Sequence, residues 1–242
     1  MSYVRVARLF PAIGLISISF IATACDSGEV SGLSGNAGAS QYIPNRSLTP
    51  PAHAADLPCG DSDSAHLCIA LKYAAYDDGS GLAVASQAQA NQNVKGVNSV
   101  WSQCHIQFFI ENYSSFDPRD HALNYQPATM DELETVRGRL SDTKTMLVTT
   151  TGNWAGALGA ETANGWTKLP AVGPFGVVIE KSVSTSAGLI AHELGHYLNL
   201  DHQQDQFNVM DPVVYHNSLN LTDSQCAMAR ATALSFWGAM LR

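Results

Sequence analysis

Residues 192–202 bring together side chains that could bind a metal ion and move a proton. The segment reads His-Glu-Leu-Gly-His-Tyr-Leu-Asn-Leu-Asp-His. His192 and His196 are four residues apart on an expected helix, so both imidazoles lie on one face about one turn apart. Two such nitrogens can bind one Zn²⁺. Glu193 is rotated about 100° from His192, beside the metal, where it can accept a proton from a zinc-bound water.

His202 is the candidate for a third zinc ligand. It can reach the same metal only if the chain turns sharply after His196, and Asn199 lies where that turn is needed. Glycine most often ends a helix in the left-handed conformation, and asparagine is the next best residue there. Three histidine ligands leave one position for water, which is the arrangement expected of a catalytic zinc site rather than a structural one.

The spacing of these residues resembles a known motif. Residues 192–202 are similar to H-E-x-x-H-x-x-G-x-x-H of the metzincin metallopeptidases, with Asn199 at the glycine position, as in the adamalysin-like branch with thrombospondin repeats. Residues 208–212, Asn-Val-Met-Asp-Pro, resemble the Met-turn of that clan, and Met210 follows His202 by eight residues. The resemblance covers residues 186–215. It implies a zinc-dependent endopeptidase in which Met210 forms an apolar floor under the histidines.

The resemblance also draws attention to Tyr215. Metzincins often carry a tyrosine soon after the Met-turn, and Tyr215 is the candidate here, although its spacing departs from the usual ones. It would imply a hydrogen-bond donor to the transition state. Residues 212–215 would by the same resemblance line the pocket for the residue that follows the scissile bond.

Helical and strand patterns alternate through the chain that must position these residues. Thr129 and Thr222 each begin a capping box, completed by Glu132 and Gln225. Expected strands cover residues 68–76, 106–110, 145–150 and 175–179, expected helices cover 86–103, 129–140, 186–198 and 222–237, and an expected loop covers 152–166. This order predicts an α/β (α+β) fold, a mixed twisted sheet with backing helices, and fits a metzincin-like zincin with an active-site helix and a C-terminal helix.

Four cysteines follow residue 25, and an even number in an exported chain indicates disulfides. Of the three possible connectivities we favour Cys59–Cys68, a local loop, and Cys104–Cys226, a long-range link. An alternative remains open, because residues 57–63 faintly resemble the cysteine switch of matrix metalloproteases, in which the cysteine binds the zinc.

The N-terminal residues resemble an export signal. Arg5 and Arg8 precede an apolar run over residues 9–21 that is too short for a comfortable membrane span. Cys25 follows small residues, as in the lipobox of bacterial lipoproteins; an ordinary signal peptide is the alternative. We expect a signal peptide over 1–24, a flexible linker or short pro-segment over 25–58, and the catalytic domain over 59–242. The chain is then a membrane-anchored lipoprotein, periplasmic or at the cell surface, or is secreted.

Charge narrows the possible partners. The formal net charge is −8 and charged residues make up 14% of the chain, so no basic surface for nucleic acid is expected. We expect a monomer that acts on proteins or peptides, with Zn²⁺ as its cofactor. A non-catalytic exported module that keeps zinc only as a scaffold is the alternative. Glu193 argues against it, because a scaffold has no use for a general base.

Overall fold

The computed structural model describes residues 59, 62, 65–160, 163–168 and 173–242. The predictions made for residues 1–58, including the signal peptide, the lipid-bearing Cys25 and the linker, lie outside the described residues. No helix in the described part of the chain is both long and apolar enough to cross a membrane.

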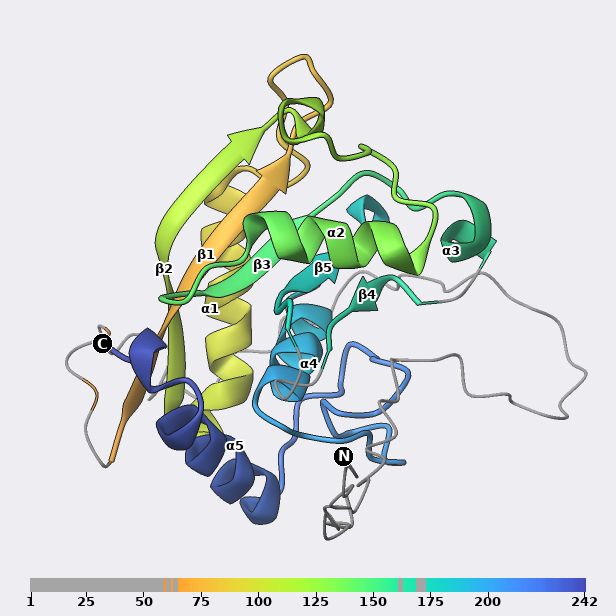
Figure 1. Ribbon diagram of the computed structural model, residues 1–242. Coiled ribbons are helices and arrows are strands. Elements are labelled where there is room, and N and C mark those ends of the chain that lie inside the picture. Colours follow the sequence, from red (N-terminus) through yellow and green to blue (C-terminus); the bar gives the residue numbers. More distant parts are fainter. Residues whose placement is uncertain (1–58, 60–61, 63–64, 161–162, 169–172) are drawn as a thin grey trace, which may run out of the picture.

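A five-stranded sheet forms the centre of the fold (Figure 1). Its order is β2 (Ile106–Phe116), β1 (Leu67–Tyr76), β3 (Met146–Thr150), β5 (Val177–Ile179) and β4 (Gly165–Trp166). All neighbouring strands are parallel except β4, which runs antiparallel to β5. The predicted mixed sheet is therefore confirmed, with β4 as its single antiparallel edge among the described strands.

β1 is buried along nearly its whole length. It is almost continuously apolar, as expected for a parallel strand covered on both faces. The exception is Lys72, whose Nζ donates a hydrogen bond of 2.8 Å to the carbonyl of Leu140. The N-terminal part of β1 is completed by a distant segment, because Leu241 bridges to Ile69 and the Arg242 amide donates to the Cys68 carbonyl at 3.0 Å.

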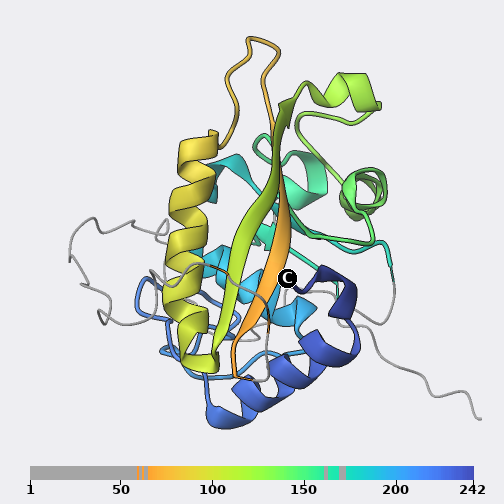
Figure 2. The ribbon, with the colours of Figure 1, turned by 90° about the vertical axis from the view of Figure 1, so that its left-hand side faces the viewer.

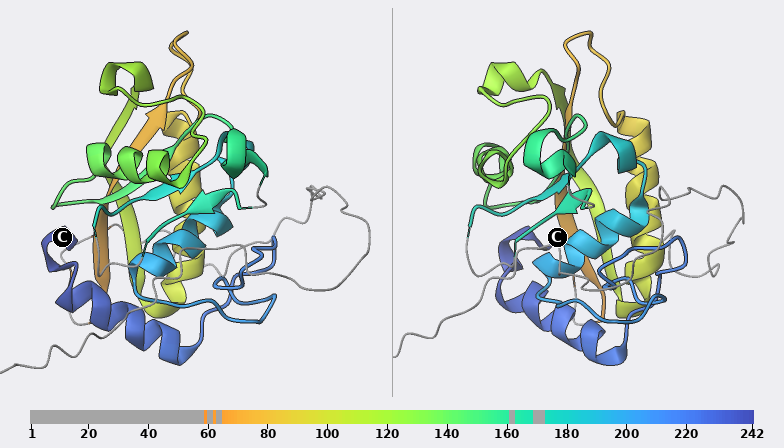
Figure 3. Two further views of the ribbon diagram at one scale, coloured as in Figure 1. Left: turned by 45° about the vertical axis from the view of Figure 1, so that its right-hand side comes forward. Right: turned by 90° about the vertical axis from the view of Figure 1, so that its right-hand side faces the viewer.

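Helices cover both faces of the sheet (Figures 1 and 2). On one face α1 (Gln87–Trp101), α4 (Ala187–Tyr197) and α5 (Asp223–Ser235) share one apolar core with β1. On the other face α2 (Met130–Leu140) and the short α3 (Gly156–Ala160) bury a second core. Figure 3 shows α4 beside α1, with a long irregular segment between α4 and α5. The described part of the chain also has four short 3-10 turns, at Ser102–Cys104, Pro118–His121, Lys181–Val183 and Gly238–Met240.

Both predicted capping boxes are present. The Thr129 hydroxyl accepts from the Glu132 amide, and the Glu132 carboxylate accepts from the Thr129 amide at 3.2 Å. Thr222 and Gln225 form the same reciprocal arrangement at the start of α5. These contacts satisfy amide groups that have no partner inside a helix, so they fix where α2 and α5 begin.

The prediction of a loop over residues 152–166 is wrong, because this segment contains α3 and β4. β4 has only two residues, and Trp166 pairs with Val178 of β5. So short a strand is defined by its partner and not by an alternating pattern of its own. β2 also runs beyond the expected end at Ile110, because its polar second half continues to pair with β1.

Both favoured disulfides are present. Cys59 is bonded to Cys68 and Cys104 to Cys226, with Cα–Cα distances of 5.5 and 4.8 Å. The cysteine-switch alternative is wrong, because the sulfur of Cys59 is already bonded to Cys68 and cannot bind a metal as a free thiolate.

Candidate metal centre

Helix α4 brings the first two histidines together. It begins at Ser186, whose hydroxyl accepts a hydrogen bond from the Leu189 amide. The Nε2 atoms of His192 and His196 lie 3.2 Å apart, and both side chains are buried. One nitrogen from each of His192, His196 and His202 lies within 4.8 Å of the other two. The three histidines predicted from the sequence are therefore gathered at one point.

The turn that brings His202 back depends on Asn199. Its φ of 62° is in the left-handed region, as predicted for this position. The Leu200 amide donates to the Gly195 carbonyl at 3.0 Å and closes the end of α4. The chain can then reverse toward the helix, and His202 comes within reach of the other imidazoles from a solvent-exposed position.

The two buried histidines have the tautomer and the neutral charge state that metal binding requires. His192 Nδ1 donates to the Val209 carbonyl at 2.7 Å, and His196 Nδ1 donates to the Leu200 carbonyl at 2.8 Å. Each Nε2 is then the unprotonated nitrogen and faces the centre of the group. Burial lowers the pKa of His192 to about 4 and that of His196 to about 3, so both are neutral at pH 7.

The separation of these nitrogens suits zinc. In a tetrahedral site with Zn–N distances of about 2.0–2.1 Å, two ligand nitrogens are about 3.3 Å apart. The observed 3.2 Å between the Nε2 atoms of His192 and His196 agrees with that spacing. Three neutral imidazoles also form a donor set that zinc prefers. The residues present therefore fit a zinc ion.

Glu193 lies buried beside the histidines. Burial raises the pKa of its carboxyl to about 8, and the positive charge of Arg137 acts in the opposite direction. Its Oε2 has no hydrogen-bond partner among the described residues. β4 passes directly over this side chain, since a β-carbon on Gly165 would lie 2.8 Å from Glu193 Oε1. The carboxylate thus keeps one oxygen available for a proton.

The expected Met-turn lies beneath α4. Met210 is fully buried, and its sulfur packs so closely on Gly195 that a β-carbon there would collide with it. The Met210 amide donates to Asn208 Oδ1 at 2.9 Å, and its carbonyl accepts from the Gln203 amide at 2.8 Å. Met210 therefore forms part of the apolar support of the helix that carries His192 and His196.

Two solved structures resemble this arrangement. Metalloproteinase-II of Bacteroides fragilis aligns with a TM-score of 0.50 and 13% identity over 72% of this chain and 56% of that one. Mature mirolysin of Tannerella forsythia, solved with a cleaved peptide, aligns with a TM-score of 0.53 and 14% identity over 74% and 95%. The chain shares the fold of these two structures, as the predicted α/β class requires. It spans little more than half the length of the first of these structures. No protein-family model and no curated protein matches the sequence.

Tyr215 lies at the surface of this fold. Its side chain is 46% exposed, and its backbone is held by Ser218, whose Oγ accepts from the Tyr215 amide at 3.0 Å. None of its hydrogen bonds with described residues reaches the three histidines. Its role as a donor to the transition state stays a prediction.

Sequence reasoning missed several residues that shape the surroundings of the three histidines and Glu193. Gly195 carries the clearest signal, because an isolated glycine inside a helical pattern indicates close packing. Gly165 and Arg137 carry none, since they reach the site only through the fold. Arg137 is fully buried, lies 2.7 Å from Glu134, and stacks 3.8 Å from the centre of the Trp166 ring. It thereby holds β4, the strand that passes over the glutamate.

Proposed function

We propose that this protein is a zinc-dependent endopeptidase. The observation that carries the proposal is the placement of three histidine nitrogens within 4.8 Å of one another, next to the buried carboxylate of Glu193. His192, His196 and His202 would hold the ion, which when bound acts as a Lewis acid and makes water a nucleophile at neutral pH.

Glu193 is the general base of this proposal. Its free Oε2 can accept a proton from the attacking water and afterwards deliver it to the leaving amine. Burial disfavours the charged form of this carboxylate and makes it a stronger base, so it accepts a proton more readily than an exposed carboxylate does. Gly165 supports this role, because any side chain there would displace the carboxylate.

The fold supports peptide substrates. One structural neighbour is described as a metalloproteinase, and the other, mirolysin, was solved in complex with a cleaved peptide. Substrate class is inferred from this likeness of fold together with the histidine geometry.

The test is incubation of the purified protein with a denatured protein mixture, with and without a chelator, followed by mapping of the cut sites. We expect cleavage that the chelator abolishes and added Zn²⁺ restores. Glu193→Gln should keep the metal and lose about 10²–10⁴-fold in rate. Glu111→Gln, on the far end of the sheet, is the matched control. Equal cleavage by Glu193→Gln and the parent protein would overturn the proposed mechanism.

The assignment of His202 as a ligand has its own test. We expect His202→Ala to lose zinc during dialysis against a chelator that leaves the parent protein loaded, since two ligands hold zinc less tightly than three. His121→Ala, at a distant site, should retain zinc. Unchanged zinc content in His202→Ala would contradict the three-histidine site.

We also propose that the protein is exported and tethered by a lipid on Cys25, on the strength of the N-terminal sequence. Fractionation of producing cells provides the measurement. Cys25→Ser should move the protein from the membrane fraction to the soluble exported fraction, and an unchanged distribution would contradict the lipid tether.

A further inference from the structure

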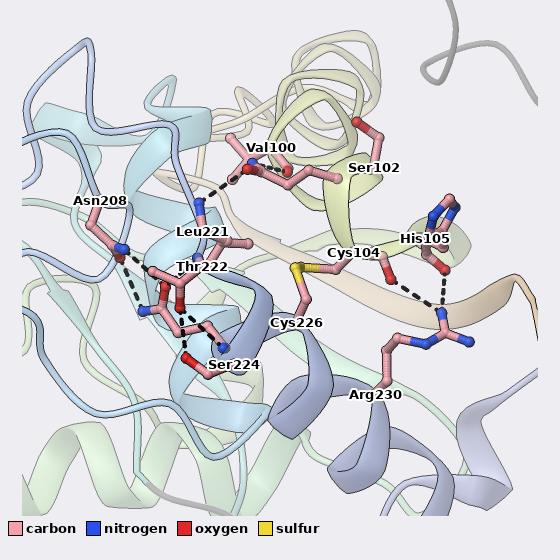
Figure 4. The surroundings of a disulfide bond; sticks show 12 residues. Val100, Ser102, Cys104, His105, Asn208, Leu221, Thr222, Ser224, Cys226 and Arg230 are labelled. Carbon is pink, nitrogen blue, oxygen red and sulfur yellow. Dashed lines mark hydrogen bonds between the residues drawn. A yellow bond between two sulfur atoms is a disulfide. The ribbon is translucent and has the colours of Figure 1, made fainter.

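Two buried amide side chains join the Met-turn to the start of α5 (Figure 4). Asn208 and Gln225 are 2% and 7% exposed. Asn208 Nδ2 donates to Gln225 Oε1 at 2.8 Å, and Gln225 Nε2 donates to Asn208 Oδ1 at 3.1 Å. The pair is therefore reciprocal, and each amide satisfies the other away from water.

The orientation of both amides is fixed by further partners. Asn208 Oδ1 also accepts from the Met210 amide at 2.9 Å, and Gln225 Oε1 also accepts from the Thr222 amide at 2.8 Å. Rotation of either side-chain amide by 180° would place its NH₂ group against a backbone N–H. Oxygen and nitrogen thus have a single assignment in each amide.

Val209 lies in the chain between Asn208, which belongs to the amide pair, and Met210, whose backbone amide donates to Asn208. Its amide donates to the Asn220 carbonyl at 2.9 Å, while its carbonyl accepts from His192 Nδ1 at 2.7 Å. Because Asn208 on one side and the Met210 amide on the other are both held by the amide pair, the direction of the Val209 carbonyl is held as well.

The α5 end of the pair is itself rigidly attached. Cys226 follows Gln225 and is bonded to Cys104 (Figure 4). Gln103 donates to the Leu219 carbonyl at 2.8 Å and accepts from the Leu221 amide at 3.1 Å. The disulfide and the hydrogen bonds of Gln103 therefore attach the start of α5, including Gln225, to the segment that follows α1.

We propose that Gln225 is a positioning residue for the metal centre. Through Asn208 it holds the Val209 carbonyl, which keeps the proton on Nδ1 of His192 and leaves Nε2 to face the metal. The inference deepens the proposed function and rests on it for the identity of the ion. Outer partners of this kind change metal affinity by about 10–100-fold when removed.

Gln225 also belongs to the capping box of α5, so the test must separate positioning from helix stability. Gln225→Glu keeps an oxygen that can accept from the Thr222 amide, but a carboxylate cannot donate to Asn208 Oδ1. Thr222→Ala is the matched control, because it removes the hydroxyl that caps α5 and leaves the amide pair intact. Gln225→Met, similar in length and without hydrogen bonds, serves as a second variant should the buried carboxylate prevent folding.

The full chain is measured in two ways. Competition with a chromophoric chelator gives the zinc affinity, and long-range ¹H–¹⁵N spectra of the metal-free protein give the tautomer of His192. For Gln225→Glu and Gln225→Met we expect about 10–100-fold weaker zinc binding and a mixture of His192 tautomers. Thr222→Ala should lower the melting temperature and leave both readouts as in the parent protein.

Parental zinc affinity and a pure Nδ1–H tautomer in the Gln225 variants would overturn the inference, as would an equal loss in Thr222→Ala. The tautomer is read without metal or substrate. A parent protein that binds no zinc or cleaves no peptide would therefore defeat the proposed function while the His192 signal still decides the role of Gln225.

Discussion

The two disulfides should differ in their contribution to stability by an amount that follows from the loops they close. Cys104–Cys226 spans a sequence separation of 122 and Cys59–Cys68 one of 9. Loop-closure entropy then gives roughly 5 kcal/mol for the first and roughly 2.6 kcal/mol for the second at 25 °C. The loops do not overlap, so the two contributions should be independent.

The perturbation is a pair of double variants, Cys104→Ala with Cys226→Ala and Cys59→Ala with Cys68→Ala. Urea titration gives the free energy of unfolding of each. We expect the long-loop variant to lose about twice as much free energy of unfolding as the short-loop variant. For a chain of this size the melting temperature should fall by about 10–20 °C in the long-loop variant and by about 5–10 °C in the short-loop variant. The reasoning is refuted if the short-loop variant loses as much stability as the long-loop variant.

Three further predictions follow from local contacts. Gly195→Ala should lower the free energy of unfolding by about 1–3 kcal/mol and weaken zinc binding, because the new β-carbon would overlap the sulfur of Met210. Gly138→Ala is the control, since a β-carbon there meets only ordinary contacts, and it should raise the free energy of unfolding by about 1 kcal/mol in urea titration. Tyr76→Phe should raise the free energy of unfolding by about 1 kcal/mol, because the buried hydroxyl of Tyr76 has no hydrogen-bond partner among the described residues. Tyr73→Phe should lower the free energy of unfolding by a similar amount, because it removes the hydrogen bond from Asn93. Backbone hydrogen bonds lower the pKa of Glu132, so its carboxylate stabilises the fold above about pH 4.5 and this contribution is lost as the pH falls through the folded-state value. The difference in unfolding free energy between Glu132→Gln and the parent, about 0.5 kcal/mol at pH 7, should therefore vanish at low pH, and a difference that persists at pH 2 would contradict it.

Local patterns predicted the elements that carry their own signals. The capping residues Thr129 and Thr222 and the periodic apolar residues behind them located α2 and α5 to within a residue or two. β4 was missed because two residues cannot show a period, and its pairing with β5 is decided by the sheet. The polar half of β2 was missed because an edge strand can be exposed and still pair.

The same division applies to the site. His192, His196 and His202 are close in sequence, so spacing and the turn at Asn199 were enough to bring them together. The contacts of Gly165 with Glu193 and of Gln225 with Asn208 join segments far apart in the chain. No local pattern in a single sequence predicts such contacts, because they form only when the fold brings distant segments together.

The completion of strand β1 by the C-terminal residues has a consequence for how the protein is made. The N-terminal half of β1 is closed on one side by Leu241 and Arg242, and Arg242 Nε lies 2.7 Å from Glu111 of β2. Synthesis proceeds from the N-terminus, so β1 leaves the ribosome long before the residues that complete its edge. This part of the edge of β1 can therefore be completed only after the chain has been synthesised as far as Arg242.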